Sequence, residues 1–355
     1  MSFWKNKKVL LTGHNGFKGS WLSFVLQKFG AHIVGVSLDN LDSPNLFNVL
    51  CLEKEIESIN LNIEDYSSLN NIINEVSPEI LIHMAAQPLV GLSYKRPFQT
   101  FMTNTAGTLN VLESVRTNTS IKSLLIVTSD KCYLNQNSTK GYKEDDKLGG
   151  FDPYSASKAA AEIVSHSYIN SFFKNKENRQ IGVATARAGN VIGGGDWSQD
   201  RIIPDIVRSY FAGQSLSIRN LDGVRPWQHV LDSIFGYLEL TEKLYKFSDE
   251  FSGPWNFGPD KESIKSVKYI LDYFEKINSK LSYDIVSNES YKETNLLLLD
   301  SSKSISKLDW EPVWRIEKSL ENTFKWYKSF YDGVDMKKYT IEQIESYIDD
   351  RGTKR

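Results

Sequence analysis

The feature that most constrains this chain is an alternation, through its first half, of short aliphatic runs and longer amphipathic stretches. The aliphatic runs are typical of buried strands, and the stretches between them repeat apolar residues at helical spacing. Strands joined through helices need right-handed crossovers, which gives a parallel sheet with helices on both faces. The pattern predicts six strands, at 9–12, 32–37, 58–61, 79–83, 123–128 and 181–186.

Four amphipathic stretches are the predicted helices. The first places its apolar side chains on one helical face, and the last begins at Pro153. The other two are expected at 66–76 and 103–117, and the last runs over 153–173. The face of the first helix consists of Trp21, Leu22, Val25, Leu26 and Phe29.

The regular alternation stops after Gly189, where glycines cluster and shorter pieces follow. We therefore predict an α/β fold, with a Rossmann-type doubly wound parallel sheet and a smaller C-terminal substrate-binding lobe. Residues 1–188 are expected to form the sheet domain, together with about 225–260. Residues 189–355 are expected to form mainly the lobe, interleaved with that domain.

Composition and charge exclude several classes of protein. The 42 basic and 44 acidic residues nearly cancel, which gives no general attraction to nucleic acid or to anionic membranes. Two cysteines cannot form a disulfide framework, and the five histidines show no metal-ligand spacing. Apolar runs are far shorter than the roughly 18 residues that span a bilayer. We expect a soluble cytoplasmic protein without metal, nucleic acid or membrane partners.

A glycine-rich turn at 12–19 lies between the first predicted strand and helix, with glycines at Gly13, Gly16 and Gly19. Such a turn lets a diphosphate approach the free amides of a helix N-terminus. The spacing is GxxGxxG rather than GxGxxG, and a turn without any ligand is the alternative. Asp39 follows 20 residues after Gly19 and favours NAD over NADP, unless it is only a turn residue.

Tyr154 and Lys158 are four residues apart and so share one face of the helix that Pro153 begins. A nearby ammonium favours the phenolate, which would let the tyrosine act as a base. This spacing also occurs by chance on surface helices. Here it follows a predicted strand that ends in Thr128-Ser-Asp-Lys131, which supplies a hydroxyl, a carboxyl and an amine.

These motifs together resemble the extended short-chain dehydrogenase/reductase family, over nearly the whole chain. Within that family the chain is similar to the sugar-nucleotide 4,6-dehydratases. Thymidine-nucleotide members carry Thr-Asp-Glu where this chain has Ser-Asp-Lys131, and the lysine fits the cytidine branch. Dehydratases acting on UDP-N-acetylglucosamine also use an Asp-Lys pair, so the pair alone does not settle the substrate. The other segments that carry the resemblance are His83–Val90, Asn190–Trp197 and Arg225–Val230.

The resemblance implies a role for each catalytic side chain. Tyr154, helped by Lys158 and Ser129, would take the C4 hydroxyl proton while hydride passes to NAD. Lys131 would then remove the C5 proton, Asp130 would protonate the leaving C6 hydroxyl, and hydride would return to C6. The alternative for Asp130 and Lys131 is a simple ion pair at a strand end.

The resemblance also implies binding residues and an assembly. The helices at 103–117 and 153–173 would form a four-helix bundle between subunits of a homodimer or homotetramer. The substrate would be a nucleotide sugar, held by Gln87, Asn104, Asn190, Arg201 and Arg225. The NAD contacts would be Gly13, Asn15, Gly16, Phe17, Lys18, Gly19, Asp39, Ala85, Ala86, Tyr154 and Lys158.

Two other functions stay open at this point. A sugar-nucleotide 4-epimerase shares the cofactor and the Tyr-Lys pair but needs no acid–base pair for elimination, so Asp130 and Lys131 argue against it. A non-catalytic NAD-binding scaffold or sensor would need neither pair, and the presence of Ser129, Tyr154 and Lys158 argues against it.

Overall fold

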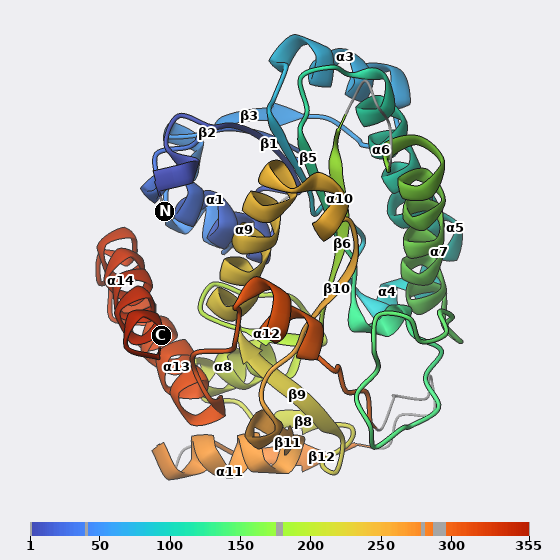
Figure 1. Cartoon of the computed structure of the whole chain (residues 1–355). Coiled ribbons are helices and arrows are strands. Elements are labelled where there is room, and N and C mark those ends of the chain that lie inside the picture. Colours follow the sequence, from blue (N-terminus) through green and yellow to red (C-terminus); the bar gives the residue numbers. More distant parts are fainter. Residues whose placement is uncertain (1, 40–41, 175–179, 278–280, 287–295, 355) are drawn as a thin grey trace.

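A seven-stranded parallel sheet forms the centre of the computed structural model, which describes residues 2–39, 42–174, 180–277, 281–286 and 296–354 (Figure 1). The strand order is β10-β6-β5-β4-β1-β2-β3. Strands β1 to β3 therefore extend the sheet in one direction and β4 to β6 extend it in the other, with the switch between β1 and β4. This arrangement confirms the predicted doubly wound fold. The strands of the sheet are β1 (Lys8–Thr12), β2 (His32–Ser37), β3 (Glu57–Asn60), β4 (Ile80–His83), β5 (Ser123–Val127), β6 (Gly182–Ala188) and β10 (Gly253–Phe257).

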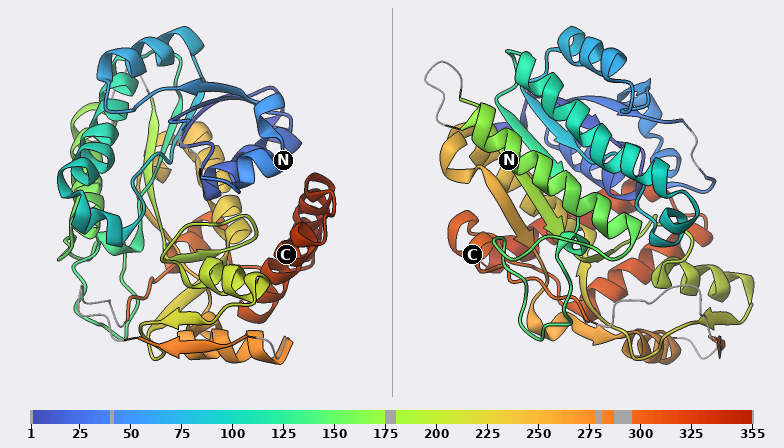
Figure 2. Two further views of the ribbon diagram at one scale, coloured as in Figure 1. Left: turned by 180° about the vertical axis from the view of Figure 1, so that it is seen from behind. Right: turned by 90° about the vertical axis from the view of Figure 1, so that its right-hand side faces the viewer.

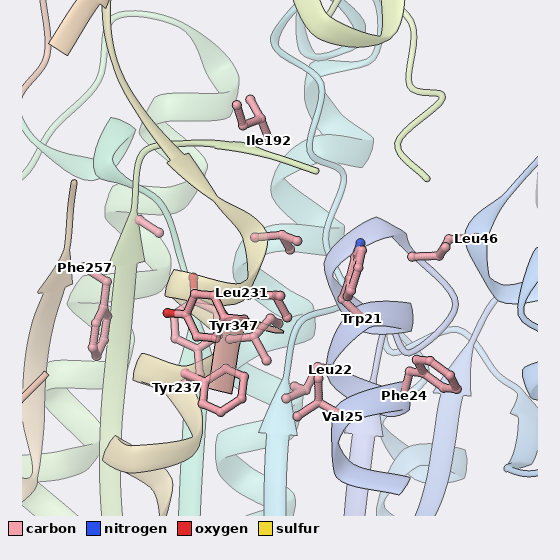
Figure 3. Packing of buried hydrophobic residues seen from close by; sticks show 14 of the residues in the cluster. Trp21, Leu22, Phe24, Val25, Leu46, Ile192, Leu231, Tyr237, Phe257 and Tyr347 are labelled. Atoms are coloured by element: carbon pink, nitrogen blue, oxygen red, sulfur yellow. The ribbon is translucent and has the colours of Figure 1, made fainter. Parts of the chain in front are cut away.

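Side chains of successive residues in the strands enter two separate cores. In β1, Val9 and Leu11 face one core and Leu10 faces the other. The first core lies under α1 and α9, and Figure 3 shows Leu22 of α1 and Leu231 of α9 within it. The second core lies under α3, α6 and α7. The helices on the sheet are α1 (Phe17–Lys28), α3 (Tyr66–Val76), α6 (Gly107–Thr117), α7 (Pro153–Tyr168) and α9 (Val230–Lys246).

The helices depart from the sequence prediction in two ways. Helix α1 is buried around most of its circumference, including Ser20 and Phe24 outside the predicted apolar face, because both α9 and the short helix α2 (Leu46–Val49) pack against it. The helix predicted to begin at residue 103 begins earlier, as α5 (Pro97–Phe101), and passes through a π-helical turn into α6. A second π-helical turn, Ile169–Phe173, ends α7.

The described residues of 190–229 and 258–354 form the part that we call the C-terminal lobe (Figure 1). It holds a three-stranded sheet in the order β11-β9-β7 and a two-stranded sheet of β12 and β8. Its strands are β7 (Asn190–Ile192), β8 (Leu216–Ile218), β9 (Val224–His229), β11 (Ile264–Ser266) and β12 (Tyr283–Ile285). Its helices are α8 (Ile202–Ala212), α11 (Val267–Ile277), α12 (Ser302–Leu308), α13 (Ile316–Tyr331) and α14 (Met336–Lys354).

The remaining α-helices of the described ranges are α2 (Leu46–Val49), α4 (Val90–Lys95) and α10 (Ser248–Phe251). Short 3-10 helices cover Ser2–Trp4, Leu52–Lys54, Asp130–Cys132 and Lys261–Ser263. None of the helices in the described ranges is long and apolar enough to cross a membrane.

Candidate active site

One cavity of about 870 Å³ lies at the carboxyl ends of β1, β4, β5 and β6, and the C-terminal lobe forms its opposite wall. Ligands of doubly wound sheets bind at this edge, where the strand order reverses. Every binding or catalytic residue expected from the sequence lines this cavity except two, Asp39 and Asn104.

The glycine-rich turn forms the floor of the cavity. Gly13 has a φ of +73°, and a Cβ there would lie 2.6 Å from the backbone nitrogen of Ala85. A Cβ on Gly19 would lie 2.0 Å from the carbonyl oxygen of Gly13, so this close packing requires glycine at both positions. Helix α1 begins after Gly16 with no side-chain cap, which leaves its first amides turned toward the cavity. This cradle fits a diphosphate, as a dinucleotide cofactor requires.

The end of β2 lies beside this turn. Asn15 donates through Nδ2 to the carbonyl oxygen of Leu38 at 2.8 Å, which ties the turn to β2. His14 contacts Ser37 and Ser58 through its two ring nitrogens, and burial lowers its pKa to about 4. Asp39 is the next residue after Leu38, which lines the cavity, and the side chain of Asp39 is exposed.

The segment after β5 places three functional groups in one short turn. The hydroxyl of Ser129 donates to Asp130 Oδ1 at 3.1 Å and accepts from the backbone nitrogen of Lys131 at 3.2 Å. Burial raises the pKa of Asp130, which favours its protonated form. A Cβ on Gly189 would lie 3.1 Å from Asp130 Oδ2, so glycine there leaves room for the carboxyl group. Lys131 is half-buried at the cavity wall.

Tyr154 and Lys158 reach the same cavity from α7 and are both buried. Burial lowers the pKa of Lys158 to about 8. Burial also raises the pKa of Tyr154 to about 12, against a hydrogen bond with Ser129 that lowers it. The pKa of Tyr154 is thus above its ordinary value, and the lowering expected from the neighbouring lysine is not seen in this structure.

The C-terminal lobe contributes two arginines to the cavity. Arg201 precedes α8 and donates through Nη1 to Asp196 Oδ2 at 2.9 Å, with its own side chain 35% exposed. Asp196 is itself buried, and the hydroxyl of Tyr327 contacts both its backbone nitrogen and its carbonyl oxygen. Arg225 lies on β9 and donates to the carbonyl oxygen of Val224. Two cationic side chains on this wall suit an anionic group such as a diphosphate.

The expected amides are placed differently from one another. Asn190 begins β7 at the cavity wall. Gln87 lines the cavity, but its side chain contacts Thr100 and the backbone of Leu89. Asn104 is buried outside the cavity wall, where its Oδ1 accepts from the backbone nitrogen of Gln87 at 2.8 Å. Asn104 therefore supports the loop that carries Gln87.

Sequence reasoning did not identify the residues that hold this site together, among them Asp196 and Glu162. Asp196 was overlooked although it lies in a segment that carried the family resemblance. Glu162 follows Lys158 by four residues, a spacing that places it on the same helical face. In the described ranges, no group of three or more His, Cys, Asp or Glu side chains could hold a metal ion.

Comparisons with known proteins identify the relatives of this chain. The model of the family described as GDP-mannose 4,6 dehydratase matches residues 10–323. The CDP-glucose 4,6-dehydratase of Salmonella typhimurium is 44% identical, over 98% of each chain. The dTDP-D-glucose 4,6-dehydratase of Dictyostelium discoideum is 26% identical, over 91% of this chain and 82% of its own.

Solved structures share the fold. The dTDP-glucose 4,6-dehydratase from Bacillus anthracis in complex with NAD has a TM-score of 0.76 at 24% identity, over 91% of this chain and 97% of its own. The UDP-glucose 4-epimerase from Thermotoga maritima has a TM-score of 0.77 at 21% identity, over 91% and 99%. The extent of the family match and the identity to the Salmonella enzyme establish that this chain belongs to the GDP-mannose 4,6-dehydratase family of the extended short-chain dehydrogenases/reductases.

Proposed function

We propose that this protein binds NAD and converts CDP-glucose into CDP-4-dehydro-6-deoxyglucose with loss of water. The observation that carries the proposal is the meeting of two pairs in one cavity: Tyr154 with Lys158 from α7, and Asp130 with Lys131 from the end of β5. The first pair suits oxidation of an alcohol, and the second suits elimination of water. The 44% identity to the Salmonella CDP-glucose 4,6-dehydratase supports the choice of nucleotide.

The turn from Gly13 to Gly19 is the proposed binding site of the NAD diphosphate. Asp39 is the proposed contact to the adenosine ribose. Asn15, Phe17, Ala85 and Ala86 would line the same cofactor. Lys18 and Lys158 also line the cavity, where cationic side chains suit a dinucleotide. When bound, NAD supplies a hydride acceptor for the oxidation and a hydride donor for the final reduction.

The side chains of the cavity would carry out three proton transfers to or from the sugar before the final reduction. Tyr154, oriented by Ser129 and Lys158, would first give its phenolic proton to solvent, because its raised pKa keeps the phenol protonated. The phenolate would then accept the proton of the C4 hydroxyl as that carbon becomes a ketone. The ketone makes the C5 proton acidic, and Lys131 removes it. Asp130, whose raised pKa favours the protonated form, gives its proton to the departing C6 hydroxyl. Water leaves, hydride would return to C6, and Lys131 would return a proton to C5, which completes the 6-deoxy sugar.

The C-terminal lobe is the proposed binding surface for the substrate, with the sheet domain holding the cofactor. Arg201 and Arg225 would clamp the diphosphate of the nucleotide sugar, and Gln87 and Asn190 would contact its sugar. Asn104 would act through Gln87. The cytoplasm as the location of this reaction stays a prediction.

The test is incubation of the NAD-loaded protein with CDP-, UDP- and dTDP-glucose, followed by mass measurement of each nucleotide sugar. We expect CDP-glucose to give a product lighter by one water. A product of unchanged mass with inverted C4 would support a 4-epimerase instead. Tight NAD binding without change in any of the three sugars would support a scaffold or sensor.

A homodimer or a dimer of dimers is also proposed, through the outer face of α5, α6 and α7. These helices run side by side (Figure 2) and leave large apolar side chains exposed. Static light scattering at micromolar concentration should give twice or four times the mass of the chain, and a monomer would contradict the proposal. The most exposed of these side chains are Phe98 (76%) and Ile163 (57%), and the π-helical turn that ends α7 adds Phe172 (44%).

A further inference from the structure

A buried ion pair lies beneath the active-site turn, outside the cavity wall. Arg187 of β6 donates through Nη2 to Glu162 Oε2 of α7 at 2.7 Å, and the two side chains are 2% and 3% exposed. Neither residue lines the cavity. Removing both charges from water is costly, so such a pair is often no more stabilising than apolar residues of the same volume. What the pair holds in place is therefore the better guide to its role.

Glu162 joins the end of β5 to α7, the helix that carries Tyr154 and Lys158. It lies one helical turn beyond Lys158, and its Oε1 accepts from the hydroxyl of Thr128 at 2.5 Å. Thr128 directly precedes Ser129. On the other carboxylate oxygen, Oε2 accepts from the hydroxyl of Thr185 at 2.8 Å.

Arg187 holds the other end of the same segment. Its Nη1 donates to the hydroxyl of Tyr133 at 2.6 Å, and its guanidinium carbon lies 4.8 Å from the centre of that ring. Tyr133 in turn donates to Asn256 of β10 at 2.8 Å. The segment from Thr128 to Tyr133, which carries Asp130 and Lys131, is thus fixed at both ends by one ion pair.

We propose that Glu162 and Arg187 are positioning residues, which hold Asp130 and Lys131 at a fixed distance from Tyr154. This inference rests on the proposed function. In the proposed reaction, oxidation takes place at C4 of the bound sugar, and water is eliminated across the adjacent C5 and C6 of the same sugar. Groups on two separate elements must then keep their relative places to within about 0.5 Å. A displacement of about 1 Å can cost roughly 100-fold in rate.

The test uses Thr128→Val, which removes the hydroxyl that donates a hydrogen bond to Glu162 and leaves the ion pair with Arg187 in place. We expect kcat for water loss to fall by about 10- to 100-fold, with the KM for CDP-glucose within about twofold of the unaltered protein. A 4-keto hexose that retains its C6 oxygen should accumulate, because Tyr154 and Lys158 of the oxidation step lie on α7 and only Ser129 shares the displaced turn. Thr128→Ser keeps the hydroxyl and should restore the rate.

Thr185→Val is the matched control, since it removes the hydrogen bond to the opposite oxygen of the same carboxylate. It should lower the unfolding temperature about as much as Thr128→Val, with water loss within about twofold of the unaltered protein. Thr128→Val that unfolds at a lower temperature but dehydrates CDP-glucose at the unaltered rate overturns the positioning role alone. An unaltered protein that removes no water overturns the proposed function and this inference together.

Discussion

The two walls of the cavity are built in different ways. On the sheet side, Asp130 and Lys131 lie in a turn whose two ends are fixed by buried hydrogen bonds. On the lobe side, Arg201 is one-third exposed and depends on Asp196, which a tyrosine of the distant helix α13 holds. The contrast suggests that the rigid wall performs the chemistry and the more open wall grips the substrate. Changes on the first should therefore lower kcat, and changes on the second should raise KM.

The largest expected effect follows Lys131→Ala, on the rigid wall. Loss of the proposed C5 base should reduce water loss by about 10²–10⁴-fold, while oxidation at C4 continues. Reduced nicotinamide, measured by its absorbance, and a 4-keto hexose should accumulate. Tyr154→Phe should instead prevent the reduced nicotinamide from forming.

Lys140→Ala removes an exposed lysine outside the cavity and serves as the control, with unchanged rates expected. Normal turnover by Lys131→Ala would show that another residue is the C5 base. It would also contradict the assignment of the chemistry to the sheet-side wall.

Asp232 tests how the C-terminal helices are attached, independently of the chemistry. Its Oδ1 accepts from the backbone nitrogen of Val313 and from the hydroxyl of Tyr347. Burial raises its pKa from 3.8 to about 6, so the folded protein binds this proton more tightly than the unfolded chain. The contribution of this proton to the free energy of unfolding is fully present below pH about 4. It falls by roughly 3 kcal/mol as the pH rises to about 6.

Asp232→Asn cannot ionise, so its free energy of unfolding should lack this decline between pH 4 and pH 6. Urea denaturation at several pH values measures the difference. Parallel pH profiles for the two proteins would show that the carboxyl group does not titrate in this range.

On the open wall, Arg201→Ala should raise the KM for CDP-glucose by about 10- to 100-fold and leave kcat within about threefold. A hydrogen bond to a charged group contributes about 1.5–3 kcal/mol, and this one is made to substrate before and during the reaction. Arg315→Ala, an exposed arginine of the same lobe, is the control. A fall in kcat with unchanged KM would assign Arg201 to the chemistry and contradict the comparison.

The smallest effect is expected from Asp39→Ala, at the outer end of the cofactor site. An exposed carboxylate contributes about 1 kcal/mol at most, so the preference for NAD over NADP should narrow by about fivefold. Binding of both cofactors, followed by fluorescence, measures this ratio. Tighter binding of NADP than NAD by the unaltered protein would show that Asp39 has another role.

Much of the sheet was predictable because buried strands leave an aliphatic signature. β2 was predicted with its observed bounds, and the other five predicted strands with small shifts at their ends. The seventh strand, β10, has the sequence Gly-Pro-Trp-Asn-Phe, which lacks that signature. It forms a strand because β6 offers it an edge, and only the folded sheet provides that edge.

The site was predictable where residues lie near one another in the sequence, as in the turn around Asp130 or the spacing of Tyr154 and Lys158. Contacts that join distant segments left no such signal. Tyr327 reaches Asp196 across 131 residues, and Arg187 reaches Tyr133 across 54. The pKa of Tyr154 was also beyond sequence reasoning, because burial sets its direction and depends on the whole fold.

The central claim is that oxidation and elimination occur on one sugar in one cavity. Its most direct test is to incubate the NAD-loaded protein with CDP-glucose deuterated at C4 and to locate the label in the product by NMR. Hydride taken from C4 and returned within the same sugar predicts deuterium on C6 of a product that has lost one water. Deuterium returned to C4 of a sugar that keeps its C6 oxygen would contradict the account.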